Sequence, residues 1–97
     1  MKQIVHLQPD ANLELIPEHC RDSLIAYIEY GRPVGDFLAA VICNDLRGAI
    51  GRADEVNLPR LKDYITLLYQ YVPSECWGNG HRYSDWLRKG MDARKSA

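Results

Sequence analysis

The chain has 97 residues, of which 46% are hydrophobic and 26% are charged, a composition typical of one globular domain rather than a disordered segment. Its formal net charge is −1, whereas domains that bind duplex DNA through phosphate contacts usually carry a basic excess. The longest apolar stretch, Phe37–Cys43, is far shorter than the roughly 20 residues of a membrane-spanning helix. The three cysteines lack paired spacing and the first residues lack a secretory apolar region, so we expect a reducing, cytoplasmic location.

Residues 1–16 differ in pattern from the rest of the chain. Two short apolar runs, Ile4–Leu7 and Leu13–Ile16, flank the turn-forming residues Pro9–Asn12. A small β-hairpin and an extended segment held by its apolar residues both fit this pattern. We therefore treat residues 1–16 as an N-terminal extension, 17–91 as a single helical domain and 92–97 as a frayed tail.

The first predicted helix begins at Pro17, because proline suits the first turn of a helix, where its missing N–H is not needed. Its apolar residues recur with helical spacing, at Cys20, Leu24, Tyr27 and Ile28. Gly31 is expected to end the helix in a left-handed conformation, and Pro33 supports a break there.

The second predicted helix runs from about Val34 to Asp54 and contains a polar anomaly. On a helical wheel, Asp45 falls inside the apolar arc, and Arg52 lies on nearly the same face. A buried carboxylate is costly unless it is paired or hydrogen-bonded. Either Asp45 accepts hydrogen bonds from the backbone of a neighbouring loop, or Asp45, Asn44 and Arg52 anchor a ligand or partner. A catalytic acid is less favoured, because no second carboxylate or nucleophile is evident beside Asp45.

The third predicted helix, residues 58–72, has the clearest pattern. Asn57 suits its N-cap, Pro59 lies in its first turn and Pro73 ends it. The core stripe consists of Leu58, Leu61, Ile65, Leu68 and Val72. A second set of residues flanks this stripe, namely Tyr64, Leu67 and Tyr71, with Tyr30 of the first helix. Tyrosine is enriched at binding surfaces, so this set is either an interaction surface or a face that packs against the N-terminal segment.

A fourth helix is predicted from about His81 to Met91, with Tyr83, Trp86, Leu87 and Met91 facing inward. Four helices with short connections predict a mainly α fold, a small antiparallel bundle. The C-terminal region is rich in cations: Arg82, Arg88, Lys89, Arg94 and Lys95. Such a set is usually a solvated helix face, and binding of single-stranded nucleic acid is the less favoured alternative.

The remaining candidates for chemistry are histidines and cysteines. They are His6, His19, Cys20, Cys43, Cys76 and His81. Zinc sites usually show CxxC or HxxxH pairs, which this sequence lacks. Cys76 lies near His81 in the sequence, but a loop cysteine after a proline-terminated helix is more often a packing residue. We therefore expect no metal, no cofactor and no enzymatic activity.

One pattern extends over about residues 16–87. It reads IPE at 16–18, GRPVGDFL at 31–38, AVICNDL at 40–46, RAD at 52–54, Asn57, and PSECWG at 73–78. In this order the residues resemble a group of small proteins encoded by bacteriophages and prophages. The resemblance implies a phage accessory protein that acts in the bacterial cytoplasm, and it implies no mechanism or site residues.

These observations lead to one function hypothesis and two alternatives. The hypothesis is a non-enzymatic protein that binds another protein, either a host or defence protein or a second copy in a homodimer. The first alternative is a binder of small ligands or nucleotides, anchored by Asp45, Asn44 and Arg52. The second is binding of single-stranded nucleic acid through the basic C-terminal helix.

Overall fold

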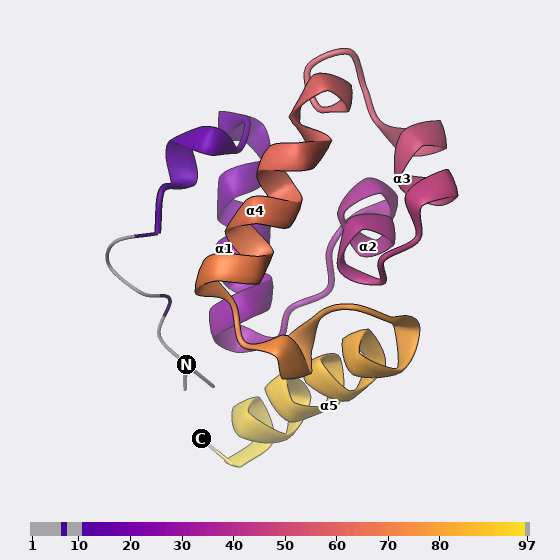
Figure 1. The fold of residues 1–97 in the computed structure, drawn as a ribbon. Helices are drawn as coiled ribbons and strands as arrows, with labels where there is room; N and C mark the ends of the chain where they lie inside the picture. The colour runs from indigo at the N-terminus through magenta and orange to yellow at the C-terminus, as the bar shows by residue number, and fades with distance from the viewer. Residues whose placement is uncertain (1–6, 8–10, 97) are drawn as a thin grey trace.

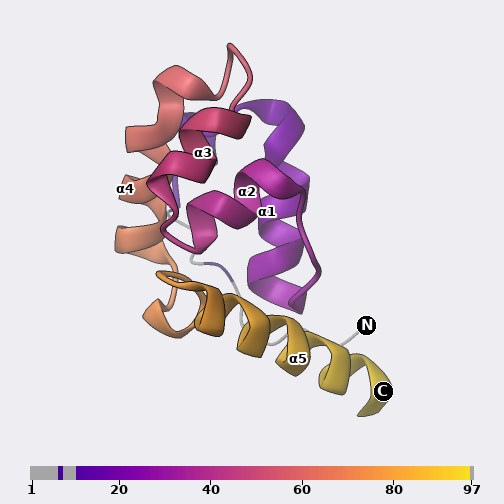
Figure 2. The ribbon, with the colours of Figure 1, turned by 90° about the vertical axis from the view of Figure 1, so that its right-hand side faces the viewer.

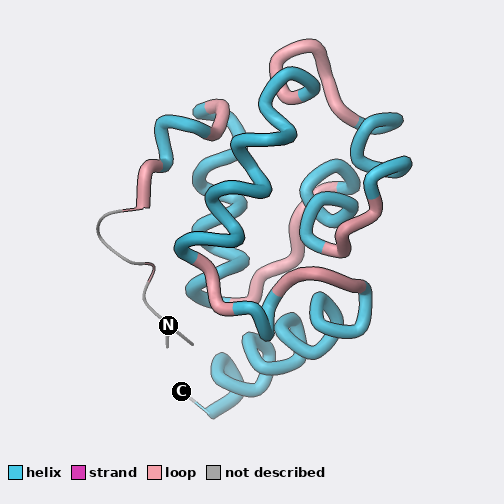
Figure 3. Tube along the Cα trace, viewed as in Figure 1, coloured by secondary structure: helices cyan, strands magenta, loops and turns pink. Residues whose placement is uncertain are grey.

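The computed structural model describes residues 7 and 11–96, which form helices joined by short loops, without a strand (Figures 1 and 3). The α-helices are α1 (Glu18–Tyr30), α2 (Asp36–Ile42), α3 (Leu46–Arg52), α4 (Leu61–Tyr71) and α5 (Gly80–Ser96). Single turns of 3-10 helix, Leu13–Leu15, Leu58–Arg60 and Ser74–Cys76, precede α1, α4 and α5. The mainly α fold is confirmed, with five α-helices in the described residues instead of about four.

The N-terminal extension contributes to the core. Its second apolar run forms a 3-10 turn, in which the Asn12 side chain accepts a hydrogen bond from the Glu14 N–H, so the β-hairpin alternative is not supported. The first run lies mostly outside the described residues. Ile16 is fully buried. The Arg21 side chain donates to the carbonyls of Leu13 and Ile16, each at 2.9 Å, which ties the turn to α1.

The prediction of one continuous second helix is wrong, because this range forms two helices, α2 and α3, with a break at residues 43–45. Asn44 adopts the left-handed conformation, with φ 59°. Its N–H bonds to the Val41 carbonyl, and the Asp45 N–H bonds to the Ala40 carbonyl, the pattern of a Schellman C-cap. Asp45 is the N-cap of α3 and is exposed, not buried in an apolar arc. The two capping residues therefore outweigh the continuous apolar periodicity on either side.

The core lies between α1, α2, α4 and α5, and its largest fully buried side chains are Trp86, Tyr27 and Tyr64. α5 crosses one end of the molecule (Figure 2). There the Trp86 Nε1–H donates to the carbonyls of Tyr27 and Ile28, at 2.9 and 3.2 Å. The Tyr27 carbonyl also accepts from the Gly31 N–H, so the indole chiefly supplies a partner to the Ile28 carbonyl in the last turn of α1.

Two glycines let α1 and α5 approach closely. Gly31 ends α1 with φ 67°, as predicted. A Cβ atom on Gly31 would lie 2.7 Å from the Gly90 Cα, and a Cβ atom on Gly90 would overlap the Tyr30 carbonyl oxygen. Arg94 also donates to that carbonyl, at 2.9 Å. This contact lies within residues 92–96, which are helical in α5 instead of frayed as predicted.

Several residues predicted to face inward are exposed. Ile65 and Leu58 belong to the predicted core stripe of the third helix, but they are 40% and 47% exposed. Met91 is 48% exposed on α5. Leu68 and Val72 are buried as predicted, but the core also takes Tyr64 and Leu67 from α4, so the buried face of α4 is rotated relative to the predicted stripe.

Candidate functional site

Large exposed hydrophobic side chains gather on α3, α4 and the segment between them. In the described part of the chain this segment and the two helices hold all such residues except Met91: Leu46, Ile50, Val56, Leu58, Ile65 and Tyr69. Tyr69 is 80% exposed and Leu46 is 68% exposed. Single exposed apolar residues are ordinary on a protein surface, but a cluster of them marks a candidate contact site.

The cluster borders a groove between α3 and α4. One hollow of about 520 Å³ is lined by Leu46, Leu61, Lys62, Ile65, Thr66, Tyr69 and Gln70. A second hollow, of about 160 Å³, shares Leu46, Leu61 and Ile65 with the first and extends to Asn44, Asp45 and Ala49. We call these two adjoining hollows the α3–α4 groove.

Local helix geometry explains why the groove is apolar. Leu61, Ile65 and Tyr69 follow one another at intervals of four residues along α4, and such residues share one helix face. Leu46 and Ile50 are related in the same way on α3. The break at Asn44 starts α3 as a separate helix, with Leu46 in its first turn. Leu46, Leu61, Ile65 and Tyr69 thus line the groove, and Ile50 continues the apolar row of α3 beyond it.

The predicted tyrosine surface is wrong, because its central residues belong to the core. Tyr64 and Leu67 are both 0% exposed, and the Tyr64 ring packs edge-on against Phe37 at 5.5 Å between centroids. Tyr71 and Tyr30 are half-buried. The 3-10 turn Leu13–Leu15 packs on α4, as the alternative interpretation of this face expected.

The predicted anchoring residues lie at the surface beside the groove. The Asp45 carboxylate accepts a hydrogen bond from the Gly48 N–H at 3.0 Å, which caps α3. Asp45 and Arg52 line one open hollow over Gly48, but no ion pair joins them among the described residues. A Cβ atom on Gly48 would overlap the Asp45 carboxylate and lie 2.7 Å from Arg52 Nη1. Asn44 lines the groove instead.

A buried polar cluster surrounds Asn57, where the sequence predicted only a helix cap. Asn57 is 3% exposed. Its Oδ1 accepts a hydrogen bond from the Tyr64 hydroxyl at 2.6 Å, and its Nδ2 donates to Cys20 Sγ at 3.5 Å. Asn57 Nδ2 also lies 3.4 Å from His19 Nε2. Burial raises the pKa of the Tyr64 phenol.

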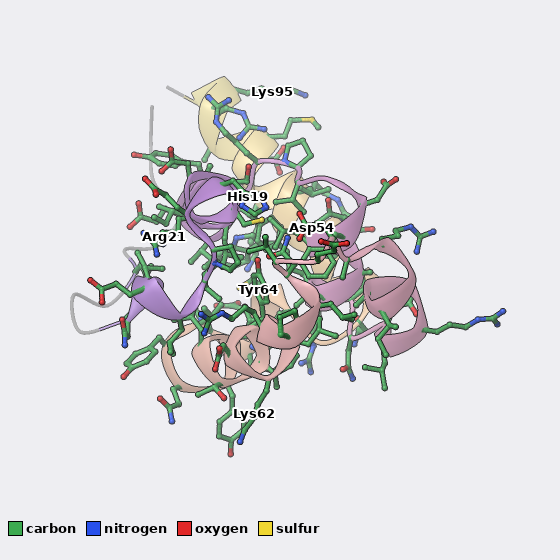
Figure 4. All side chains as sticks on the ribbon, turned by 90° about the horizontal axis from the view of Figure 1, so that it is seen from above. His19, Arg21, Asp54, Lys62, Tyr64 and Lys95 are labelled. Atoms are coloured by element: carbon green, nitrogen blue, oxygen red, sulfur yellow. The ribbon has the colours of Figure 1, made fainter. Side chains whose placement is uncertain are left out.

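The outer part of this cluster joins α1 to the loop after α3. His19 Nε2 lies 3.2 Å from Asp54 Oδ2, and Figure 4 shows these two side chains facing each other above Tyr64. The Asn57 backbone N–H donates to Asp54 Oδ1 at 2.7 Å. This bond, with the nearby His19, holds the pKa of the Asp54 carboxyl below its usual range. The cluster therefore cross-links three segments through satisfied hydrogen bonds.

Cys76 and His81, which lie near each other in the sequence, do not form a bonded pair in the described part of the chain. Cys76 is fully buried, and its thiol donates to the Pro73 carbonyl. Burial raises the pKa of this thiol to about 12, which disfavours the nucleophilic thiolate. His81 instead pairs with Asp85 at 3.2 Å. Among the described residues, no three His, Cys, Asp or Glu side chains lie together as metal ligands do.

Most of the basic side chains predicted as a set on the C-terminal helix bind the protein itself. Arg82 donates to the carbonyls of Ser74 and Trp77, and Arg94 donates to that of Tyr30. Two others form ion pairs, Arg88 with Asp85 and Lys89 with Glu75. The contacts of Arg82, Lys89 and Arg94 tie α5 to other segments, and all four of these cations are less available for a phosphate backbone.

Comparisons with known proteins found no matching family model, no similar curated protein and no similar solved structure. Within residues 7 and 11–96, no helix has the length and apolar character needed to cross a membrane.

Proposed function

We propose that the chain acts by binding another protein, and that the α3–α4 groove is its binding surface. The supporting observation is the exposed apolar cluster around the groove, with Leu46, Ile65 and Tyr69 at its centre. Protein-binding surfaces characteristically have an apolar core that contains aromatic residues, with polar residues at the rim. The polar residues Lys62, Thr66 and Gln70 line the same hollow.

The cellular context extends this proposal. A non-enzymatic accessory protein of phage or prophage origin, acting on a host or defence protein in the bacterial cytoplasm, accords with the residue pattern described above. The homodimer remains a second form of the same protein-binding hypothesis.

The size of the groove favours a moderate affinity. Complete burial of an exposed leucine, isoleucine or comparable side chain contributes about 1.5–3 kcal/mol. Leu46, Ile65 and Tyr69 are 68%, 40% and 80% exposed, so burying the exposed part of these three side chains contributes roughly 3–6 kcal/mol, from which the cost of association must be subtracted. A micromolar complex needs about 8 kcal/mol. We therefore expect additional polar or charged contacts at the rim to assist binding.

The test is capture of proteins from bacterial lysate by three tagged chains. They are the wild type, a groove variant with Leu46→Ser, Ile65→Ser and Tyr69→Ser, and a control with Val56→Ser and Met91→Ser. The control removes exposed apolar residues that do not line the groove. Circular dichroism establishes that each chain is folded.

We expect the wild type and the control to retain the same protein, and the groove variant to lose it. Retention of that protein by the groove variant would refute the groove as the binding surface. If the wild type retains nothing above empty resin, across lysates of infected and uninfected cells, the protein-binding proposal fails.

A further inference from the structure

Three cations near the α3–α4 groove have side chains without a hydrogen bond or ion pair to any residue in the described ranges: Arg47, Arg52 and Lys62. This distinguishes them from the basic side chains of α5, most of which bind carbonyls or carboxylates of the chain. Nearby Arg60 is already paired with Asp63. The cations that remain available are therefore concentrated on α3 and α4.

These cations lie on both sides of the groove. Lys62 lines the groove on α4. Arg47 and Arg52 line the open hollow on α3, which adjoins the groove at Asp45. The Asp45 carboxylate is occupied by the Gly48 N–H and offsets only one of the three positive charges. Figure 2 looks onto α3, with α4 beside it. Asp36 shares two further hollows with Arg52 and offsets a second charge, so the excess of positive charge at the rim is small and rests on Arg47 and Lys62.

We infer that the occupant of the groove is an amphipathic helix of a partner protein, whose apolar stripe is flanked by acidic residues. This inference rests on the proposed function. Leu46 on α3 faces the row Leu61, Ile65 and Tyr69 on α4 across the groove, and an apolar helix face fits such an apolar lining. Acidic residues beside that face would complement the charged rim, and such complementarity sets partner choice and orientation.

The same features disfavour two other occupants. A second copy bound through this face in a two-fold dimer would place the same patch against itself, so that Arg47, Arg52 and Lys62 of the two copies would be brought together. Single-stranded nucleic acid binds through aromatic stacking platforms as well as cations. The groove offers one exposed aromatic ring, Tyr69, among aliphatic side chains.

The test uses two synthetic helical peptides with an identical leucine stripe, one flanked by glutamates and the other by lysines. Fluorescence anisotropy measures their binding to the full chain. We expect the glutamate peptide to bind at least about tenfold more tightly at low salt, with the preference shrinking as salt rises. The variant Arg47→Glu with Lys62→Glu should reverse the preference. The matched control Arg88→Glu with Lys95→Glu, on α5, should preserve it.

Four results would overturn the inference. Equal binding of both peptides, abolished by Ile65→Ser, would retain the groove as a protein-binding site and reject the acidic partner. Failure of both peptides to bind, when lysate capture still depends on the groove, would reject a helix of this kind. Tighter binding of a single-stranded oligonucleotide, lost in the Arg47→Glu and Lys62→Glu variant, would identify nucleic acid. A dimer in light scattering that dissociates on Ile65→Ser would identify a second copy.

Discussion

The buried hydrogen bond between Tyr64 and Asn57 should contribute measurably to stability, and a double-mutant cycle can isolate it. The hydroxyl and the carboxamide oxygen are 2.6 Å apart, and both side chains are at most 3% exposed. Tyr64→Phe removes one hydrogen bond and should lower the free energy of unfolding by about 0.5–1.5 kcal/mol. Asn57→Ala leaves the hydroxyl buried without this partner and also creates a cavity, so we expect a loss of about 2–4 kcal/mol.

The double variant should lose less than the sum of these two effects. Once Asn57 is absent, removing the Tyr64 hydroxyl also removes a buried group that lacks a partner. We expect a coupling of about 1–2 kcal/mol between the two sites. Urea unfolding, followed by circular dichroism, measures all four free energies. Tyr69→Phe is the matched control: Tyr69 is 80% exposed, so its change should remain within about 0.5 kcal/mol. Additive effects, within about 0.3 kcal/mol, would refute a buried bond between these side chains.

Three further predictions concern other parts of the fold. Gly90→Ala should destabilise the chain by about 1–3 kcal/mol in thermal or urea unfolding, because its Cβ atom would overlap the backbone of α1. Gly51→Ala, where a Cβ atom meets nothing within 4 Å, should instead stabilise α3 by up to about 1 kcal/mol. Equal effects of the two substitutions would contradict the close approach of α1 and α5. The pKa of Asp54 is lowered in the folded chain, so its ionised carboxylate stabilises the fold above about pH 4, and this contribution is lost as the pH falls through the folded pKa. The difference in free energy of unfolding between the wild type and Asp54→Asn should therefore shrink between pH 5 and pH 2.5. A constant difference would refute the ionic role. Alkylation of the native chain followed by mass spectrometry should modify half-buried Cys43 before Cys76, whose thiol is buried and has a pKa raised to about 12; the reverse order would place Cys76 in a reactive site.

The sequence predicted those parts of the fold in which local signals and packing agree. Gly31 ends α1 in the left-handed conformation, as expected, because the helix pattern stops there and a proline follows. The sequence did not predict the helix break at Asn44 and Asp45, because apolar residues continue with helical spacing on both sides of it. Two adjacent residues that favour caps were the available signal. Their capping bonds offset the interruption of the helix.

The candidate site was less predictable than the fold. The apolar residues of α4 cover two adjoining faces, one with Ile65 and one with Tyr64. A helical wheel of the sequence does not show which of the two packs against the core. Packing of Tyr64 against Phe37 and of α4 against the turn Leu13–Leu15 selects one face. Ile65 and Tyr69 are left on the other. These contacts are between segments distant in sequence, so residue periodicity carries no information about them.

Binding of an apolar helix in the α3–α4 groove is tested most directly by NMR. The glutamate-flanked peptide is added to the isotopically labelled full chain, and the backbone amide shifts are followed. We expect the largest shifts at residues 44–50 and 61–70, the two segments on either side of the groove. Shifts concentrated on α5, or no shifts at saturating peptide, would contradict it.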